Sequence, residues 1–396
     1  MSKLALYVFI ISWGIVGYTY FVYPLLLALI AWVSPAKDTR PAALPDDELP
    51  HVTMLVAAYN EAEVLSKKLD NTWAIDYPKE KFTLLVGSDG STDQTARILT
   101  QCSDPRLRAF TFDRRRGKAS VLNDLVEQAN DELLVMSDAN TMYAPDAVRR
   151  LVAHFADPAV GCVSGELHLE QDGGVSGEGI YWRYENWIKR NSSRLGFLIG
   201  SNGGIYALRK AAYMRLNENT IVDDFVITLR VLEQGYRVSQ DPFARATEPP
   251  CASCRQEMVR KTRIGAGDWQ AIGMTSSLLN PRFGLVCLAY WSHKIIRWTL
   301  PFFILTGLAA NFALTSNPLL LGLLGLQICG IFISVLAATT SFGTWVPKPL
   351  RAVTYFYLMN FSLLCGFWRF VTNSQRVTWE RGAPRSVDSR TASTGK

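Results

Sequence analysis

The sequence predicts an α/β domain with a mostly parallel β-sheet, joined to α-helical transmembrane segments. Between residues 52 and 136, short apolar runs alternate with helical patterns, as in parallel sheets that carry helices on both faces. The other apolar residues gather towards the ends of the 396-residue chain: residues 4–33 carry no charge, and further apolar segments follow Phe283. A hydrophobic content of 48% is high for a soluble protein, and the chain is too long for one ordinary domain.

The alternation of apolar runs and helical patterns predicts the order of the elements. In the first part of the chain we expect strands at 52–57, 82–86, 107–112 and 133–136, with helices at 61–74, from Thr92, and at 118–129. After residue 160 the pattern is looser. It predicts a strand at 160–169, a helix around 181–187, a strand at 205–208 and a helix at 222–234 that stops at Gly235.

Polarity divides the chain into six parts. Residues 1–35 are expected to form a transmembrane helix, because the uncharged run exceeds the ~20 residues of one span and the ~7–15 of a cleaved signal peptide's apolar core. A proline-rich linker (36–49) leads into the α/β domain (50–267). The other parts are interfacial helices (268–298), transmembrane helices (299–372, with apolar segments at 299–315, 319–342 and 353–371) and a basic tail (373–396) expected to be disordered.

The charge balance and the cysteines exclude several classes of function. Lysine and arginine number 41 against 35 aspartates and glutamates, a net charge of +6 that suits an anionic membrane surface or anionic ligands and not nucleic acid. The seven cysteines are scattered, so they predict no disulfide framework. The one close pair, Cys251 and Cys254, lacks the further ligands of a zinc site.

Polar side chains follow three of the predicted strands. Tyr59 and Glu61 come after the first strand, Asp89 after the second, and Asp138 and Asn140 after the fourth. Because ligands of parallel sheets bind at the carboxyl ends of the strands, we expect these side chains at one edge. Hard oxygen ligands at that edge suit Mg²⁺ or Mn²⁺. Taken alone, Ser137-Asp-Ala-Asn140 also suits a strand that runs into an Asx turn.

The order of motifs resembles the family 2 glycosyltransferases, in particular their membrane-embedded branch of hyaluronan, chitin-oligosaccharide and cellulose synthases. The resemblance covers nearly the whole chain. It rests on Ala57-Ala-Tyr-Asn-Glu61, Ser88-Asp-Gly-Ser-Thr-Asp93, Gly117-Lys118, Ser137-Asp-Ala-Asn140, Gly203-Gly204, Asp223-Asp224, Thr247-Glu-Pro249 and Arg263. It implies a GT-A type nucleotide-sugar-binding domain that transfers a sugar, with inversion, from a UDP-linked donor.

The resemblance also implies roles for individual residues. Asp224 would be the general base, and Asp223 would raise the pKa of Asp224. Arg263 would be a further catalytic residue. Donor binding would fall to Ala57, Tyr59, Glu61, Asp89, Lys118 and Asp138. Tyr59 would stack on the uracil and Asp89 would accept from its N–H. Mg²⁺ or Mn²⁺ would bind Asp138 and Asn140, and the acceptor would contact Gly203, Gly204 and Arg260.

Two departures from the family pattern bear on the reaction. Asp138-Ala-Asn140 stands where the family often has D-x-D, so one carboxylate is lost. Arg260-Lys-Thr-Arg263-Ile264 stands where processive synthases have Q-x-x-R-W, so the tryptophan that contacts the acceptor is missing. We therefore expect addition of one sugar to a lipid-linked or glycan acceptor. The alternatives are a processive polysaccharide synthase and a catalytically inactive membrane subunit or transporter.

The membrane topology predicted from the sequence is inconsistent with itself. We expect a multi-pass protein of the cell (inner) membrane whose catalytic domain lies in the cytoplasm. Because one span precedes that domain, the N-terminus then lies outside. If the segment 353–371 also crosses, as its length favours, Arg376 and the later arginines of the tail lie outside, against the positive-inside rule.

Overall fold

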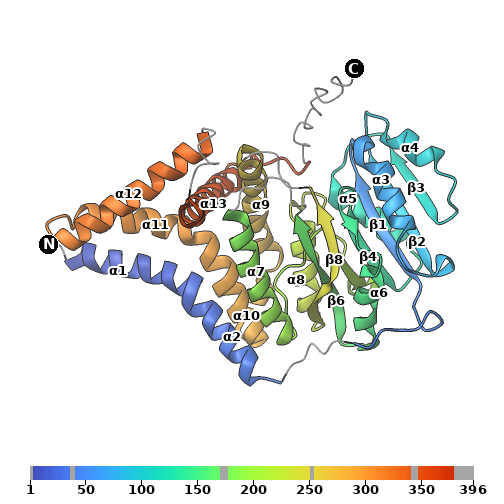
Figure 1. Ribbon diagram of the computed structural model, residues 1–396, viewed down its shortest axis with the longest axis horizontal. Coiled ribbons are helices and arrows are strands. Elements are labelled where there is room, and N and C mark those ends of the chain that lie inside the picture. Colours follow the sequence, from blue (N-terminus) through green and yellow to red (C-terminus); the bar gives the residue numbers. More distant parts are fainter. Residues whose placement is uncertain (1–2, 36–40, 170–176, 250–253, 340–346, 379–396) are drawn as a thin grey trace, which may run out of the picture.

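The computed structural model describes residues 3–35, 41–169, 177–249, 254–339 and 347–378. The predictions for part of the linker (36–40), for Cys251 and for most of the tail (379–396) fall outside the described residues. An α/β domain occupies one side of the molecule, and a bundle containing α1, α11 and α12 occupies the other (Figure 1).

β1 (Val52–Ala58) is the centre of the first half of the sheet. All of its residues are buried. It pairs in parallel with β2 (Phe82–Asp89) and β4 (Leu133–Asp138), and β3 (Leu107–Phe112) adds in parallel to β2. Strands buried on both faces appear in a sequence as continuous apolar runs, which is why these four lie where the sequence predicts them.

Beyond β4 the sheet changes direction. β7 (Tyr206–Arg209) is antiparallel to β4 and to β6 (Val160–Leu169). β8 (Arg237–Glu248) runs parallel to β6, and β5 (Met142–Tyr143) is antiparallel to β8. The eight strands follow the order β3-β2-β1-β4-β7-β6-β8-β5, which confirms a mostly parallel sheet. β5 and β8 are absent from the predicted strands, because β5 is very short and β8 contains Pro242 and many polar residues.

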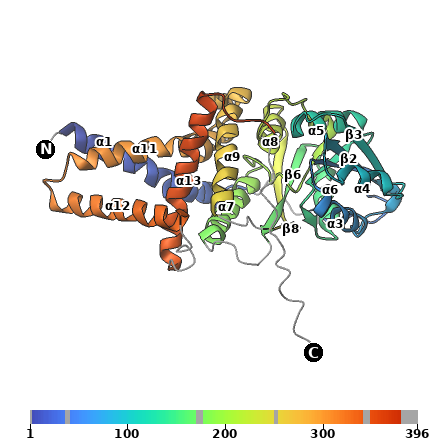
Figure 2. The ribbon, with the colours of Figure 1, turned by 90° about the horizontal axis from the view of Figure 1, so that it is seen from above.

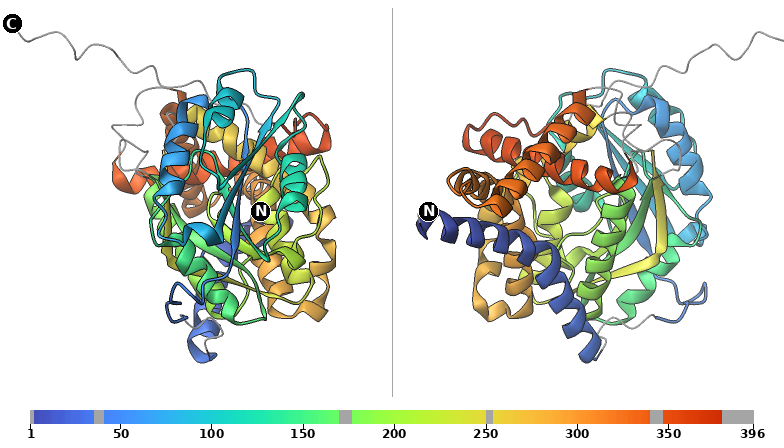
Figure 3. Two further views of the ribbon diagram at one scale, coloured as in Figure 1. Left: turned by 90° about the vertical axis from the view of Figure 1, so that its right-hand side faces the viewer. Right: turned by 60° about the vertical axis from the view of Figure 1, so that its left-hand side comes forward.

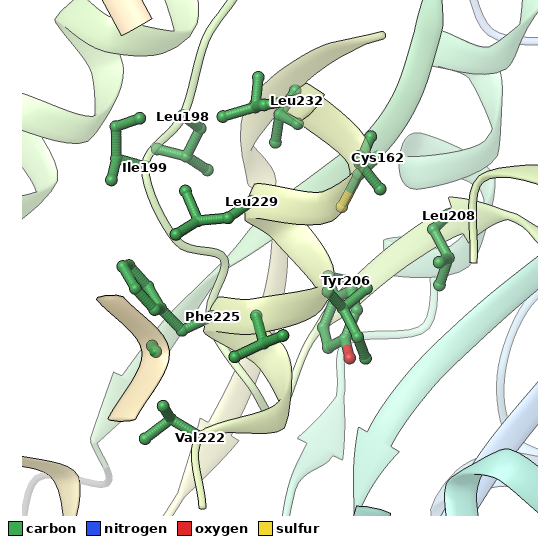
Figure 4. Close-up of a cluster of buried hydrophobic side chains, with 14 of the residues drawn as sticks. Cys162, Leu198, Ile199, Tyr206, Leu208, Val222, Phe225, Leu229 and Leu232 are labelled. Carbon is green, nitrogen blue, oxygen red and sulfur yellow. The ribbon is translucent and has the colours of Figure 1, made fainter. Parts of the chain in front are cut away.

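Helices cover both faces of the sheet. Next to one face lie α3 (Ala62–Trp73), α4 (Thr95–Gln101) and α6 (Ala147–Ala153), and next to the other lie α5 (Lys118–Gln128) and α8 (Asp223–Glu233). Figure 4 shows the second core, in which Phe225, Leu229 and Leu232 of α8 share one cluster with Tyr206 and Cys162 of the sheet. Short 3₁₀ segments are η2 (Lys79–Lys81), η3 (His154–Ala156), η4 (Lys210–Ala212), η5 (Ser276–Leu279) and η6 (Pro281–Phe283).

Three helices of the described residues are long and apolar enough to cross a membrane: Lys3–Val33, Leu285–Phe312 and Pro318–Ala337. The first comprises α1 (Lys3–Gly17), the π-helical segment η1 (Tyr18–Val22) and α2 (Tyr23–Val33). The second comprises α10 (Leu285–Ala289), the π-helical segment η7 (Tyr290–Ile295) and α11 (Ile296–Phe312), and the third belongs to α12 (Pro318–Thr339). In Figure 3, the dark blue α1 and α2 run beside α11 and α7 (Gly177–Arg194) respectively.

The structure does not separate the expected interfacial segment before residue 299 from the helix that follows it. Residues 285–298 continue without a break into α11, so they are the first half of a spanning-length helix. Lys294 and Arg297 suggested an interface, but both line an internal cleft. Charged side chains inside a bundle can be accommodated in this way.

α13 (Lys348–Val371) is not among the helices that could cross a membrane in the described part of the chain. It packs instead along α9 (Cys254–Met274), as Figure 2 shows. The ring centroids of Trp269 and Phe367 are 5.0 Å apart. α9 continues past residue 267, so the expected end of the α/β domain falls inside a helix. The segment after α13 returns to the α/β domain: Arg376 and Val377 line the same cleft as Lys118. The expected crossing by 353–371 stays a prediction, and this packing speaks against it.

Candidate active site

The polar strand ends open onto one cleft of about 1790 Å³. It begins at the carboxyl ends of β1 and β4 and extends to residues of α7, α9, α11 and α13. Most of the predicted site residues line it, namely Ala57, Glu61, Lys118, Asp138, Asn140, Gly203, Gly204, Asp223, Asp224, Arg260 and Arg263. Folding thus gathers side chains that lie between residues 57 and 263 of the sequence.

Lys118 is the centre of the charged cluster in this cleft. Its Nζ lies 2.8 Å from Asp138 Oδ1 and 3.1 Å from Asp223 Oδ2. Lys118 begins α5, Asp138 ends β4 and Asp223 begins α8, so three element ends meet here. Burial alone would lower the pKa of Lys118, but Asp138 and Asp223 outweigh it and raise that pKa well above its ordinary value. Lys118 is therefore a permanent cation between two carboxylates.

Asp224 lies beside this cluster, in the first turn of α8. Burial and the neighbouring charge of Asp223 raise the pKa of Asp224 to about 6, although Lys118 acts in the opposite direction. Gly203 lies against Asp224, and a Cβ on Gly203 would come within 2.8 Å of Asp224 Oδ2. A side chain at position 203 would displace the carboxylate, which explains the glycine. A buried carboxylate with a pKa near neutrality is suited to accept a proton.

Glu248 is a further carboxylate of the cleft that the predicted site did not include. It ends β8, and its Oε1 accepts a hydrogen bond from the Thr141 hydroxyl. Burial and the charge of Asp138 raise the pKa of Glu248. A Cβ on Gly204 would come within 2.6 Å of Glu248 Oε1, so the second glycine also allows close approach. The Thr247-Glu-Pro249 motif could have indicated Glu248 as a site residue, but the same residues also suit an ordinary loop.

Asp89 and Tyr59 are the predicted donor-binding residues that do not line the cleft. Asp89 is 0% exposed, and its two oxygens accept from the backbone N–H groups of Arg116 and Gly117 at 2.7 and 2.8 Å. It therefore orients the turn that carries Lys118, and its predicted contact with a nucleobase stays a prediction. The guanidinium of Arg115 lies 3.7 Å from the centre of the Tyr59 ring and covers one of its faces.

Residues 53–216 match the family model described as "Glycosyl transferase family 2". This segment is a family 2 glycosyltransferase domain. It contains Lys118, Asp138 and the two glycines at 203 and 204, whereas Asp223, Asp224 and Glu248 come from the chain that follows it.

Relatives of the family 2 domain include polysaccharide synthases. The poly-beta-1,6-N-acetyl-D-glucosamine synthase of Staphylococcus aureus (strain COL) is 28% identical over 206 residues, which are 50% of this chain and 50% of that protein. The synthase of Staphylococcus epidermidis is 26% identical over 202 residues, 49% and 48% of the two chains. The chain thus spans about half the length of the curated relatives that it matches.

Among solved structures, the mannosyltransferase PcManGT from Pyrobaculum calidifontis, in complex with GDP-Man and Mn²⁺, is similar over 92% of this chain and 99% of that chain. The TM-score is 0.72 at 22% sequence identity. The likeness therefore concerns the fold, which is the GT-A type with added helices.

Two arginines of α9, Arg260 and Arg263, line the cleft. Arg263 donates from Nη1 to the carbonyl of Ile221 at 3.2 Å, just before Asp223, and so holds the start of α8. Arg260 pairs with Glu257 of its own helix, with N–O distances of 2.8 and 3.0 Å. Ile264 lines the cleft at the position where a processive synthase has tryptophan.

Lys68 of α3 lies beneath the family 2 site and was not predicted. Its side chain is 1% exposed, and its Nζ donates to Ser137 Oγ at 2.7 Å and to the Thr141 carbonyl at 2.6 Å. These two residues flank Asp138 and Asn140. Burial lowers the pKa of Lys68 to about 7, although Asp138 and Glu248 favour its charged form. Lys68 therefore ties the turn after β4 to the core.

Replacing Lys68 with methionine should destabilise this turn. The substitution leaves the Thr141 carbonyl and the Ser137 hydroxyl without their buried donor, which typically costs about 1–3 kcal/mol. We expect a lower thermal unfolding temperature and a higher KM for the sugar donor. Lys67→Met is the matched control, because Lys67 is the exposed neighbour on the same helix. Equal behaviour of the two variants would contradict the positioning role of Lys68.

Proposed function

We propose that this chain is an inverting glycosyltransferase that moves one sugar from a nucleotide-diphosphate sugar, UDP-linked, to a lipid-linked or glycan acceptor at the membrane. The observation that carries the proposal is the cluster of Asp138, Lys118 and Asp223 beside Asp224, in a cleft between a family 2 domain and membrane helices. Such a cleft can receive a soluble donor from the sheet side and an acceptor from the membrane side.

In the proposed reaction, Asp224 takes the proton of an acceptor hydroxyl. The acceptor oxygen attacks the anomeric carbon, the bond from that carbon to the diphosphate breaks, and the nucleoside diphosphate leaves with the bonding electrons. This single displacement inverts the anomeric carbon. Lys118 supplies a compact positive charge beside the diphosphate, and its own position is held by Asp138 and Asp223.

The residues at the strand end fit a divalent metal that the donor helps to bind. The described residues contain no group of three or more His, Cys, Asp or Glu side chains arranged to hold a metal. Asp138 and Asn140 line the cleft and offer a carboxylate and an amide oxygen, and Mg²⁺ typically binds one or two carboxylates together with substrate phosphates. The bound ion would neutralise charge on the departing diphosphate. The Mn²⁺ in the PcManGT complex supports this proposal.

The donor is tested directly by incubating the detergent-purified chain with UDP- and GDP-sugars and measuring the released nucleotide. Release from UDP-sugars is the expected result. The GDP-Man in the PcManGT complex makes release from GDP-sugars the outcome that would replace UDP in the proposal.

Product length separates single transfer from polymerisation. Ile264 lacks the aromatic face on which a sugar of a growing chain stacks, and Arg260 and Arg263 add positive charge nearby. We expect a product one sugar longer than its acceptor, however long the incubation. Mass analysis of products from membranes supplied with donor is the measurement. A ladder of repeating units would favour the processive synthase, the candidate that the names of the staphylococcal relatives support.

The proposed location is the cell (inner) membrane, with the α/β domain in the cytoplasm. Three crossings at Lys3–Val33, Leu285–Phe312 and Pro318–Ala337 place the N-terminus outside, and α13 and Arg376 inside. The positive-inside rule is then satisfied, because α13 need not cross. A reporter that works only in the cytoplasm should be active when it is fused after Lys396. Activity of a periplasmic reporter at the same position would contradict this topology.

A further inference from the structure

The membrane side of the cleft contains a second group of charges, separate from the Lys118 cluster. Lys189 of α7, Lys294 of η7 and Arg297 of α11 all line it. Arg297 Nη1 pairs with Glu185 Oε1 at 2.5 Å and its Nη2 donates to the Tyr181 hydroxyl at 2.8 Å. Lys189 Nζ donates to Asn202 Oδ1 at 2.5 Å. Within the described part of the chain, Lys294 has neither a hydrogen bond nor an ion pair, and its Nζ lies 5.4 Å from the Phe225 ring.

Within the described part of the chain, Arg297 is the one of these three cations that forms an ion pair with a carboxylate. The three cations face the carboxylates of Glu185 and Asp268, and burial raises the pKa of Asp268 to about 7, so that this group is partly protonated at neutral pH. Burial, together with the charge of Lys294, lowers the pKa of Lys189 to about 8. Cations held in a sheltered cleft without full compensation are costly unless an anion joins them.

Two π-helical segments shape this region. η1 and η7 each interrupt a candidate span, and they lie against each other. The Tyr18 hydroxyl is 2.8 Å from Ser292 Oγ, and the rings of Tyr23 and His293 stack at 6.1 Å. π-helical turns widen a helix locally and occur frequently at functional sites. Two such turns meeting beside Lys294 indicate a site built for a ligand.

The loop Gly200–Gly204 joins the two groups of charges. A Cβ on Gly200 would contact Phe225 and lie 4.0 Å from Lys294 Nζ, Asn202 holds Lys189, and Gly203 lies against Asp224. Gly200 and Gly203 are three residues apart, so their Cα atoms are separated by at most about 11 Å. An anion beside Lys294 and a hydroxyl beside Asp224 can therefore belong to one acceptor molecule.

The cleft also has an apolar exit. Val16, Phe21, Phe356 and Met359 line it where η1 and α13 come together, and the rings of Tyr20 and Phe356 are 5.5 Å apart. Phe21 is 68% exposed and belongs to the candidate span Lys3–Val33, so in the proposed topology this wall faces the hydrocarbon of the bilayer. A hydrocarbon chain could leave the cleft at this point without crossing polar surface.

We propose that Lys189, Lys294 and Arg297 bind the phosphate of an anionic lipid acceptor, whose hydrocarbon tail leaves between η1 and α13. The proposal rests on the proposed function and narrows its acceptor from a lipid-linked or glycan molecule to a lipid phosphate. The chemistry recognised by the three cations is a phosphate or diphosphate monoester, and the apolar exit selects the lipid-bound form over the free anion.

Binding to the full-length, detergent-purified chain tests the proposal without any sugar donor. Calorimetric titrations would compare farnesyl phosphate, farnesol and inorganic phosphate. Farnesyl phosphate should bind at least about tenfold more tightly than either of the others, because only it meets both the cations and the apolar exit. Lys294→Gln and Lys189→Gln should each weaken that binding about tenfold or more. Arg282→Gln is the matched control, since it removes an exposed cation next to the same candidate span.

Each alternative result overturns the assignment. Equal affinity for farnesol would reduce the site to an apolar groove, and equal affinity for inorganic phosphate would make it a free-anion site. Wild-type affinity in both lysine variants would place the anion elsewhere. Nucleotide binding, measured in the same variants, keeps the two proposals apart. Absence of sugar transfer to any acceptor, while farnesyl phosphate still binds, would remove the proposed function alone, whereas transfer to a neutral glycan without lipid-phosphate binding would remove only this inference.

Discussion

Replacing Asp224 with asparagine should lower the rate of sugar transfer by ~10²–10⁴ while donor binding stays close to that of the wild type. Asparagine keeps the shape against Gly203 but cannot accept the acceptor's proton. Steady-state turnover with the preferred donor, together with nucleotide titrations, measures both quantities. Turnover like that of the wild type would show that another group is the base.

The pH dependence of the wild type follows from the same carboxylate. Burial and Asp223 raise the pKa of Asp224 to about 6, and a base works only when it is deprotonated. The rate should therefore fall as the pH decreases through about 6. Asp223→Asn removes a neighbouring negative charge, so it should lower the pKa of Asp224 and move the acidic limb to lower pH, with a milder loss of rate. An unchanged acidic limb in that variant would contradict the coupling.

Replacing Asp138 with alanine should reduce both nucleotide-diphosphate affinity and the rate of transfer, the rate by about 10²-fold or more, since a metal that stabilises the leaving charge is typically worth several kcal/mol. Addition of a chelator to the wild type should have the same effect, and Mg²⁺ or Mn²⁺ should reverse it. Asn140→Ala is the matched control on the same turn and should lose less, because an amide is a weaker ligand than a carboxylate. Full activity in chelator would exclude the metal from the mechanism.

Some of the candidate site was predictable from the sequence because it lies at strand ends. Asp138 follows an apolar run that is buried on both faces, and such a run is visible in the sequence without any structure. The carboxyl ends of parallel strands meet at one edge, so the position of Asp138 in the cleft followed from the strand assignment alone. The motif alone identified Asp223 and Asp224. They lie beside Lys118 because the start of α8 meets the start of α5.

Other site residues depend on contacts that no local pattern reports. Lys68 resembles a solvated helix residue in the sequence, and only the packing of α3 against the turn after β4 buries it. Asp89 occupies a motif position associated with donors, yet the turn at Arg116 and Gly117 folds over it and takes both of its oxygens. A carboxylate's exposure depends on chain segments distant in sequence, so a motif cannot predict it.

By itself, the sequence determined the four parallel strands, the apolar segments and the set of acidic strand ends, because burial on both faces and membrane-like hydropathy are local properties of composition. Only the tertiary structure decided that α13 lies along α9 and returns Val377 to the cleft. That packing joins segments that lie far apart in the sequence, so no local pattern contains it. The grouping of Lys189, Lys294 and Arg297 was likewise a tertiary result, because their helices meet only when two spans and the α/β domain pack together. Burial of charge is a property of that packing, and the sequence of any one helix does not contain it.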